Sequence, residues 1–172
     1  MTAILGFTEI LKRGYGKSRQ DSLHYLDTIH SSGQNLLELI NDILDLSKVE
    51  SGRLEVEETW VEPHRIIQDV IGMLDLKARE KGLALNFAPQ GQLPQKIKTD
   101  PARFRQIIFN LVGNAIKFTA KGSVTVTCQL KKNKAPQLQV DIRDTGIGIA
   151  PEKVESVFDP FTQADAKVTR HF

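Results

Sequence analysis

Hydrophobic residues recur at helical spacing through the first third of the chain. A first run predicts a short helix over residues 2–12, and a loop with two glycines follows at 13–20. A second run advances in steps of three and four and predicts a long helix over 21–50 that ends near Gly52. Its apolar stripe consists of Leu23, Leu26, His30, Gly33, Leu37, Ile40 and Leu44, widened by Ile29, Leu36 and Ile43. Two antiparallel helices bury little surface by themselves, so we expect a second copy to complete a four-helix bundle.

The pattern changes between residues 55 and 62, where helices begin to alternate with strands. Apolar spacing predicts helices that begin at Pro63 and at Pro101, the second capped by Asp100 and running to about residue 119. Period-two alternation predicts a strand within 54–63, another at 83–87, and a hairpin of 123–130 and 137–144, followed by a short helix at 150–158. We therefore predict an α+β protein in which an N-terminal helical hairpin, 1–55, precedes a layered α/β domain, 56–172.

Composition and charge exclude several classes of protein. Hydrophobic residues make up 40% and charged residues 26% of the 172 residues, which is ordinary for a globular protein. The net charge is only +2 and the basic residues are scattered apart from "LKKNK" at 130–134, so no nucleic-acid partner is expected. The single cysteine, Cys128, excludes an internal disulfide framework and is predicted to be a buried strand residue.

Membrane and targeting signals are not visible in the sequence. No apolar run approaches the about 20 residues needed to cross a bilayer. The first residues lack a basic leader and a small-residue cleavage site. We expect a cytoplasmic segment without direct membrane contact, which leaves open a membrane anchor elsewhere in a larger protein.

Three polar residues interrupt the apolar pattern of the helix that begins at Pro101. Asn110, Asn114 and Lys117 are spaced four and then three residues apart, so they share one side of the helix. Amide oxygens can coordinate Mg²⁺, and a lysine can pair with phosphate. A solvated helix face is the alternative interpretation. The neighbouring face is expected to be apolar and consists of Phe104, Ile107, Ile108, Leu111, Val112 and Ala115.

A glycine-containing turn, "DTGIGI" at 144–149, follows the last predicted strand. Gly146 and Gly148 let the backbone turn tightly and approach a ligand closely. Asp144, at the strand end, can accept a hydrogen bond from an exocyclic amine such as that of adenine. The stretch lacks the Gly-Lys-Ser/Thr of a phosphate-binding loop and the third glycine of a dinucleotide fingerprint. An ordinary turn is the alternative.

Together these motifs resemble the ATP-binding domain of sensor histidine kinases. "DPARFRQIIFNLVGNAIKFT" (100–119) resembles their N box, "DTGIGI" their G1 box and "VFDPFTQAD" (157–165) their F box. "LLELINDILDLSKVESGRLEVE" (36–57) resembles the second helix of their dimerisation domain, and "MTAILGFTEIL" (1–11) resembles the end of the first. The resemblance implies half of a dimeric four-helix bundle at 1–55 and, at 56–172, an ATP-binding α/β sandwich shared with DNA gyrase and heat-shock chaperones.

The resemblance implies a role for each matching residue. Asn114 would ligate Mg²⁺, Asn110 would support the metal and the phosphates, and Lys117 would contact the phosphates of ATP. The adenine pocket would be formed by Asp144, which holds the amine, with Gly146 and Gly148. A lid over ATP would contain Phe158, Phe161 and Arg170.

The resemblance also implies functional parts outside this sequence. The phosphoacceptor histidine of the family would lie six positions before Met1, and a glycine-rich G2 box would follow Phe172. We therefore predict no catalytic residue within the chain, and weak or absent ATP binding by the chain alone. His24 and His30 fall on the wrong helix to replace the phosphoacceptor.

The implied activity is autophosphorylation of a histidine with ATP and relay of the phosphoryl group to a response-regulator aspartate. One alternative is a non-catalytic dimerisation or adaptor fragment, which the long apolar stripe would also suit. Another is an ATPase of the gyrase-like superfamily. Those ATPases usually carry a catalytic carboxylate on the helix of the N box, and no Asp or Glu occurs between Arg103 and Thr119.

Overall fold

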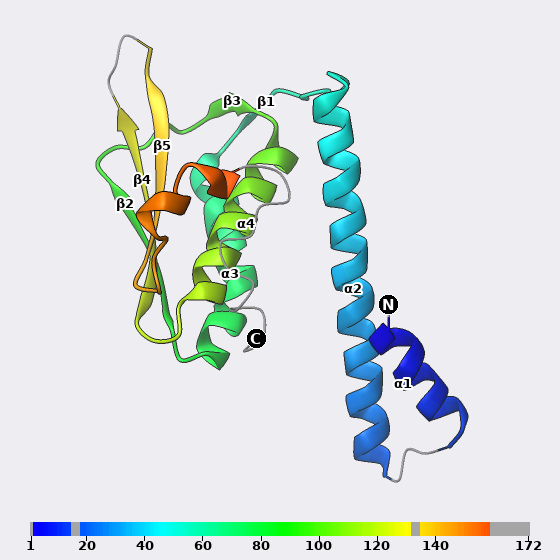
Figure 1. The fold of residues 1–172 in the computed structure, drawn as a ribbon. Coiled ribbons are helices and arrows are strands. Elements are labelled where there is room, and N and C mark those ends of the chain that lie inside the picture. Colours follow the sequence, from blue (N-terminus) through cyan, green and yellow to red (C-terminus); the bar gives the residue numbers. More distant parts are fainter. Residues whose placement is uncertain (1, 15–17, 132–134, 159–172) are drawn as a thin grey trace. The chain divides into compact units, whose positions relative to one another are not determined.

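The structure is a computed structural model that describes residues 2–14, 18–131 and 135–158, except for the side chains of four of them, Asn35, Glu38, Asp42 and Phe158. It divides into two compact units, Met1–Val56 and Glu57–Phe172, which we call the helical unit and the sheet unit (Figure 1). None of the described helices is both long and apolar enough to cross a membrane.

The helical unit is the predicted hairpin of α1 (Thr2–Lys12) and α2 (Arg19–Glu50). The side chain of Ser18 caps α2 by accepting a hydrogen bond of 3.0 Å from the backbone N–H of Asp21. Beyond the other end of α2, Gly52 takes a positive φ of 65°, as expected for a residue that terminates a helix. Phe7 of α1 stacks on Tyr25 of α2 with ring centroids 5.1 Å apart.

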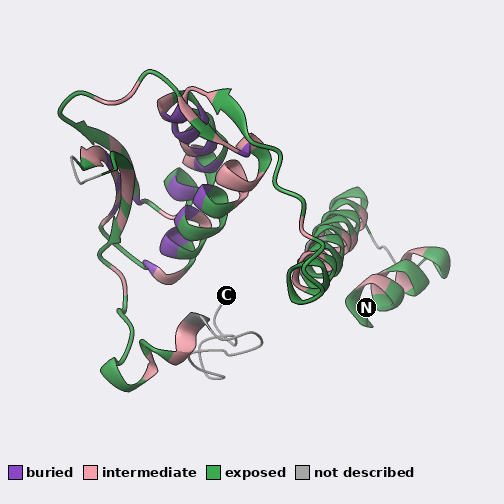
Figure 2. Ribbon diagram, turned by 90° about the horizontal axis from the view of Figure 1, so that it is seen from above, coloured by how far each residue is buried: buried purple, intermediate pink, exposed green. Residues whose placement is uncertain are grey.

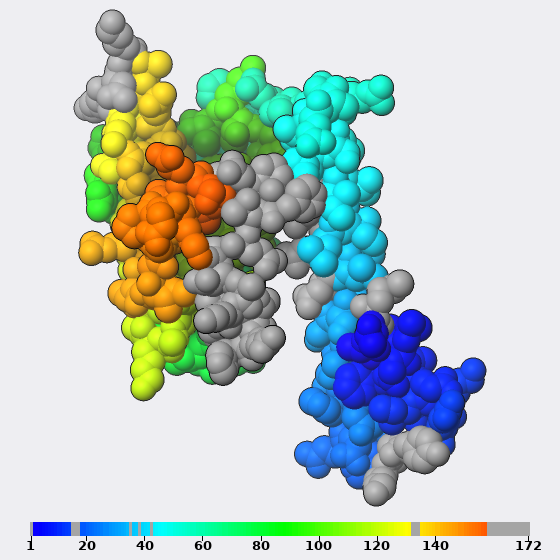
Figure 3. Space-filling model, viewed as in Figure 1, coloured from blue at the N-terminus to red at the C-terminus, as the bar shows by residue number. Residues whose placement is uncertain are grey.

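Much of the apolar stripe on α2 is exposed within the helical unit. No described side chain of α1 or α2 is buried, as the green and pink colouring of both helices in Figure 2 shows. Leu37 is 63% exposed, and Leu23, Leu26, Ile40 and Leu44 are exposed as well. The short α1 lies against the N-terminal part of α2 (Figure 3). Since helices rise about 1.5 Å per residue, an 11-residue helix cannot cover one of 32 residues.

The sheet unit packs two helices, α3 (Pro63–Glu80) and α4 (Pro101–Phe118), against one three-stranded sheet. The strands β2 (Ala84–Gln90), β4 (Ser123–Lys131) and β5 (Gln137–Asp144) lie in the order β2-β4-β5. β4 and β5 form the predicted antiparallel hairpin, whereas β2 runs parallel to β4. A parallel pair needs a long crossover, and α4 lies within the crossover between these two strands. This arrangement confirms the predicted α+β class.

Two short elements differ from the sequence expectations. The strand β1 (Thr59–Val61) pairs antiparallel with β3 (Ile97–Thr99), a strand that the sequence analysis did not predict. Three residues are too few to show an alternating pattern. The expected short helix at 150–158 consists instead of two 3₁₀ turns, η1 (Pro151–Lys153) and η2 (Ser156–Phe158). Segments this short do not repay the cost of nucleating an α-helix.

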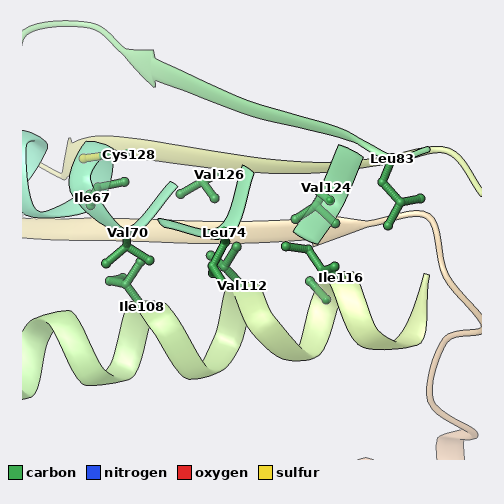
Figure 4. Close-up of a cluster of buried hydrophobic side chains, with 12 residues drawn as sticks. Ile67, Val70, Leu74, Leu83, Ile108, Val112, Ile116, Val124, Val126 and Cys128 are labelled. Atoms are coloured by element: carbon green, nitrogen blue, oxygen red, sulfur yellow. The ribbon is translucent and has the colours of Figure 1, made fainter. Parts of the chain in front are cut away.

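The core of the sheet unit lies between the two helices and β4. Figure 4 shows Ile108, Val112 and Ile116 of α4 on the side of the helix that faces α3 and the sheet. Facing residues are Ile67, Val70 and Leu74 of α3, and Val124, Val126 and Cys128, which alternate along β4 and are fully buried. Burial raises the pKa of the Cys128 thiol, so this thiol stays protonated.

The apolar face of α4 is narrower than predicted. Ile107 is 55% and Leu111 45% exposed, although both were expected to be in the core. The buried residues form one arc of the helix, centred on Ile108 and Val112. Each residue turns the helix by about 100°, which places Ile107 and Leu111 beyond this arc, on the side of Asn114.

Asp100 fixes the start of α4. One carboxylate oxygen accepts hydrogen bonds from the backbone N–H groups of Ala102, at 2.9 Å, and Arg103, at 3.0 Å. The other accepts from the backbone N–H of Glu57 at 3.2 Å. The bond from Arg103 makes the largest contribution to a pKa below the usual value for Asp100, despite opposing desolvation. The capping carboxylate thus also ties the first residue of the sheet unit to α4.

Candidate functional site

The polar stripe of the sequence analysis lies on the second half of α4. Asn110, Asn114 and Lys117 are all exposed, each within one turn of the next. The Nζ atom of Lys117 lies 5.1 Å from the ring centroid of Phe118, within the range of a cation–π interaction. The last turn of a helix also favours a positive charge, because the carbonyl dipoles point towards it.

The C-terminal end of α4 meets the turn that follows β5, which we call the Asp144 turn (residues 144–148). The backbone N–H of Ile147 donates a hydrogen bond of 3.4 Å to the carbonyl of Phe118. A Cβ atom on Gly146 would lie 2.5 Å from the same carbonyl oxygen, so only glycine allows this approach. Gly148 has a φ of 70°, a conformation that also favours glycine.

Asp144 is the last residue of β5 and is exposed. One of its carboxylate oxygens accepts a hydrogen bond of 2.8 Å from the backbone N–H of Gly146. The other oxygen makes no hydrogen bond among the described residues. The turn therefore orients the carboxylate through one oxygen and leaves the second able to accept from a ligand.

Two residues that the sequence analysis missed support this region. Lys81 follows α3, and its Nζ atom donates to the carbonyls of Ile116, at 3.1 Å, and Lys117, at 2.9 Å, at the end of α4. Thr145 joins the Asp144 turn to the loop before β4, because its hydroxyl accepts a hydrogen bond of 3.1 Å from the N–H of Ser123. No local pattern in the sequence signals either contact, since both join residues far apart in the chain.

The lid residues fall largely outside the described part of the chain. Phe158 is the last residue of η2, and its side chain is not described. Phe161 and Arg170 lie outside the described residues.

The donor set at this site suits a metal only in part. Asparagine side chains offer amide oxygens, which are acceptable ligands for Mg²⁺. Among the described residues, no group of three or more His, Cys, Asp or Glu side chains could hold a metal ion. The amides of Asn110 and Asn114 therefore fit a cation whose remaining ligands come from phosphate oxygens and water.

A second hollow of the sheet unit lies away from these residues. This open groove of 340 Å³ is at the N-terminal ends of α3 and α4, whereas the polar stripe and the Asp144 turn are at the C-terminal end of α4. Arg105 pairs with Asp69 across it at 3.3 Å. Its lining contains none of the predicted site residues and consists of Trp60, Val61, Glu62, Arg65, Ile66, Asp69, Lys96, Pro101 and Arg105.

Comparison with known families matches both units of the chain. Residues 1–52 match the family model described as the His Kinase A (phospho-acceptor) domain. Residues 99–172 match the model described as the histidine kinase-, DNA gyrase B- and HSP90-like ATPase.

Similar proteins match along nearly the whole chain. The signal transduction histidine-protein kinase BarA of Escherichia coli (strain K12) is 38% identical over 173 residues, which cover 99% of this chain and 18% of that protein. The sensor protein GacS of Pseudomonas syringae pv. syringae is 38% identical over 99% of this chain and 19% of that protein. The solved structure of full-length ShkA in complex with AMPPNP has a TM-score of 0.74 and 30% identity, over 86% of this chain and 31% of that one. The chain thus spans less than a fifth of the length of these two curated relatives.

Proposed function

Because this chain belongs to the sensor histidine kinases, we propose that the end of α4 and the Asp144 turn bind ATP, and that the protein containing them is an ATP-dependent protein-histidine kinase. One observation carries this proposal. The hydrogen bond from Ile147 to Phe118, with the close approach of Gly146, holds the Asp144 turn against the helix end that carries Asn114 and Lys117.

Each side chain has a role that follows from its chemistry. Asn114 ligates Mg²⁺, supported by Asn110, and Lys117 pairs with the phosphates as a point charge. The second carboxylate oxygen of Asp144 accepts a hydrogen bond from the adenine amine. The glycines of the Asp144 turn let the backbone lie close to the base.

The reaction we assign to the whole protein is phosphoryl transfer to a histidine and then to a response regulator. The γ-phosphoryl group leaves ADP for a histidine nitrogen, and then passes to an aspartate of a receiver domain. Such transfers depend on positioning and charge neutralisation more than on covalent chemistry by the binding site. Asn114 and Lys117 supply these two contributions here, and the phosphoacceptor histidine is expected outside this sequence.

Titration of the chain with magnesium-ATP, followed by NMR of backbone amides, tests the site. We expect shifts confined to the second half of α4 and the Asp144 turn, even if binding is only millimolar. Asn114→Ala should weaken magnesium-ATP binding about tenfold or more, or about 1.4 kcal/mol, because a metal ligand is lost. Asn86→Ala, an exposed asparagine of β2, is the matched control and should change nothing. Shifts around the Trp60 groove instead would refute the site.

The exposed stripe on α2 supports a homodimer. We propose that two copies bury the stripe in a four-helix bundle, since α1 leaves it uncovered. Sedimentation equilibrium should find a dimer, and Leu37→Asp should dissociate it. Leu39→Asp is the matched control, because Leu39 is also exposed, at 59%, but projects from the other side of α2. A wild-type monomer at all accessible concentrations contradicts the proposal.

Two other functions predict different results. A dimer whose spectrum does not change with magnesium-ATP would favour a non-catalytic adaptor. A gyrase-like ATPase is disfavoured by α4, which carries no Asp or Glu, and by matched relatives that include the helical unit and are named kinases.

A further inference from the structure

The rung that ends the β4–β5 ladder is formed by a side chain. The backbone N–H of Thr145 donates to the carbonyl of Ser123 at 3.2 Å, as in an ordinary antiparallel pair. The return bond from the N–H of Ser123 goes to the Thr145 hydroxyl at 3.1 Å, where an ordinary pair would use the Thr145 carbonyl. The hydroxyl thus takes the place of the residue's own carbonyl and closes the ladder.

This substitution lets the chain leave the sheet directly after Asp144. Asp144 still pairs in register with the fully buried Val124, so its backbone belongs to the sheet. The next residue but one, Gly146, already lies against Phe118 of α4 and binds the Asp144 carboxylate. The orientation of that carboxylate therefore depends on a sharp exit of the chain at Thr145.

The loop between α4 and β4 is built around the same hydroxyl. Gly122 has a φ of 113°, and a Cβ atom added there would clash with the Thr145 hydroxyl. The carbonyl of Gly122 accepts a hydrogen bond of 3.1 Å from Ala84 at the start of β2. The hydroxyl proton of Thr145 faces the carbonyls of Lys121, at 3.3 Å, and Ser123, at 3.4 Å. Three segments, the start of β2, the loop before β4 and the end of β5, therefore meet at Thr145.

We propose that Thr145 is a positioning residue that orients the Asp144 carboxylate and so sets the preference of the site for adenine. The inference rests on the proposed ATP site. Thr145 touches no base itself, because its hydroxyl is directed at the loop before β4. Without the hydroxyl, the Ser123 N–H loses its partner and the exit of the chain loosens. Asp144 then samples orientations that no longer distinguish an amine from a carbonyl on the base.

The test compares Thr145→Val, which keeps the shape without the hydroxyl, with Thr145→Ser, which keeps the hydroxyl. Thr125→Val in β4 controls for the loss of a threonine hydroxyl elsewhere in the same sheet. Magnesium-ATP and magnesium-ITP are the probes, because inosine carries a carbonyl where adenine carries the amine. We expect Thr145→Val to reduce the ATP-over-ITP preference about tenfold through weaker ATP binding, with ITP binding unchanged. A tenfold change corresponds to about 1.4 kcal/mol. Thr145→Ser and Thr125→Val should retain the preference.

Amide hydrogen exchange without nucleotide provides a second readout. In Thr145→Val, exchange at Ser123, Gly146 and Ile147 should accelerate about tenfold, while the amides of α3 remain protected. Equal losses of ATP and ITP binding, or unchanged exchange at these three amides, would overturn the proposal. If the wild-type chain binds neither nucleotide, the proposed function and the base preference both fail. The exchange data then still decide whether Thr145 holds the turn.

Discussion

Gly146→Ala is expected to abolish ATP binding at the proposed site and to destabilise the sheet unit. An alanine Cβ would lie 2.5 Å from the carbonyl oxygen of Phe118 and 2.8 Å from a carboxylate oxygen of Asp144. Neither atom is the end of a flexible side chain, since one is helix backbone and the other is held by the turn. Relief of the clash must separate the Asp144 turn from α4, and overpacking of this kind costs about 1–3 kcal/mol.

Urea unfolding and magnesium-ATP titration of the same variant measure the two effects. Gly72→Ala is the matched control, because Gly72 lies on the exposed side of α3 with no atom within 4 Å of the added Cβ. There the same substitution should raise the free energy of unfolding by up to about 1 kcal/mol, through better helix propensity. A Gly146→Ala variant with wild-type stability and wild-type ATP binding would show that the contact with Phe118 is not needed.

Ile116→Ala is expected to lower the free energy of unfolding of the sheet unit by about 2–5 kcal/mol. Ile116 is fully buried, in a core shared by α3, α4 and β4 (Figure 4). Removing three carbon atoms leaves a cavity that the surrounding strands and helices cannot fill completely. Domains are stable by only about 5–15 kcal/mol, so this one change threatens folding itself.

Ile107→Ala on the same helix is the control for Ile116→Ala. Ile107 is 55% exposed, so its truncation removes little buried area and should cost less than about 1 kcal/mol. Chemical denaturation followed by circular dichroism compares the two variants. Equal losses of stability would mean that the buried arc of α4 is not centred on Ile108 and Val112.

Local signals explain why the main helices were predictable from the sequence. Asp100 and Pro101 mark the start of α4 because a carboxylate can satisfy the free N–H groups of a first turn, and the structure shows those hydrogen bonds. Gly52 marks the end of α2 because it adopts a positive φ readily. The hairpin of β4 and β5 follows from period-two alternation. Each of these signals acts within a few residues of the chain.

The candidate site was predictable only in its residues. The N-box and G1-box patterns pointed to Asn110, Asn114, Lys117 and Asp144 without showing how the two motifs are held together. Their connection depends on the Phe118 carbonyl and on two residues that no motif includes, Lys81 and Thr145. A hydrogen bond between residues tens of positions apart leaves no periodic trace in the sequence.

The sequence by itself determined the order of helices and strands, their caps and the amides and carboxylate available to a nucleotide, because these depend on local backbone preference and on residue type. Only the tertiary structure decided which apolar residues of α4 are buried, why Ile107 and Leu111 are not, and how three-residue strands such as β3 find partners. Burial and pairing depend on what lies nearby in space, and the folded chain alone establishes those neighbours.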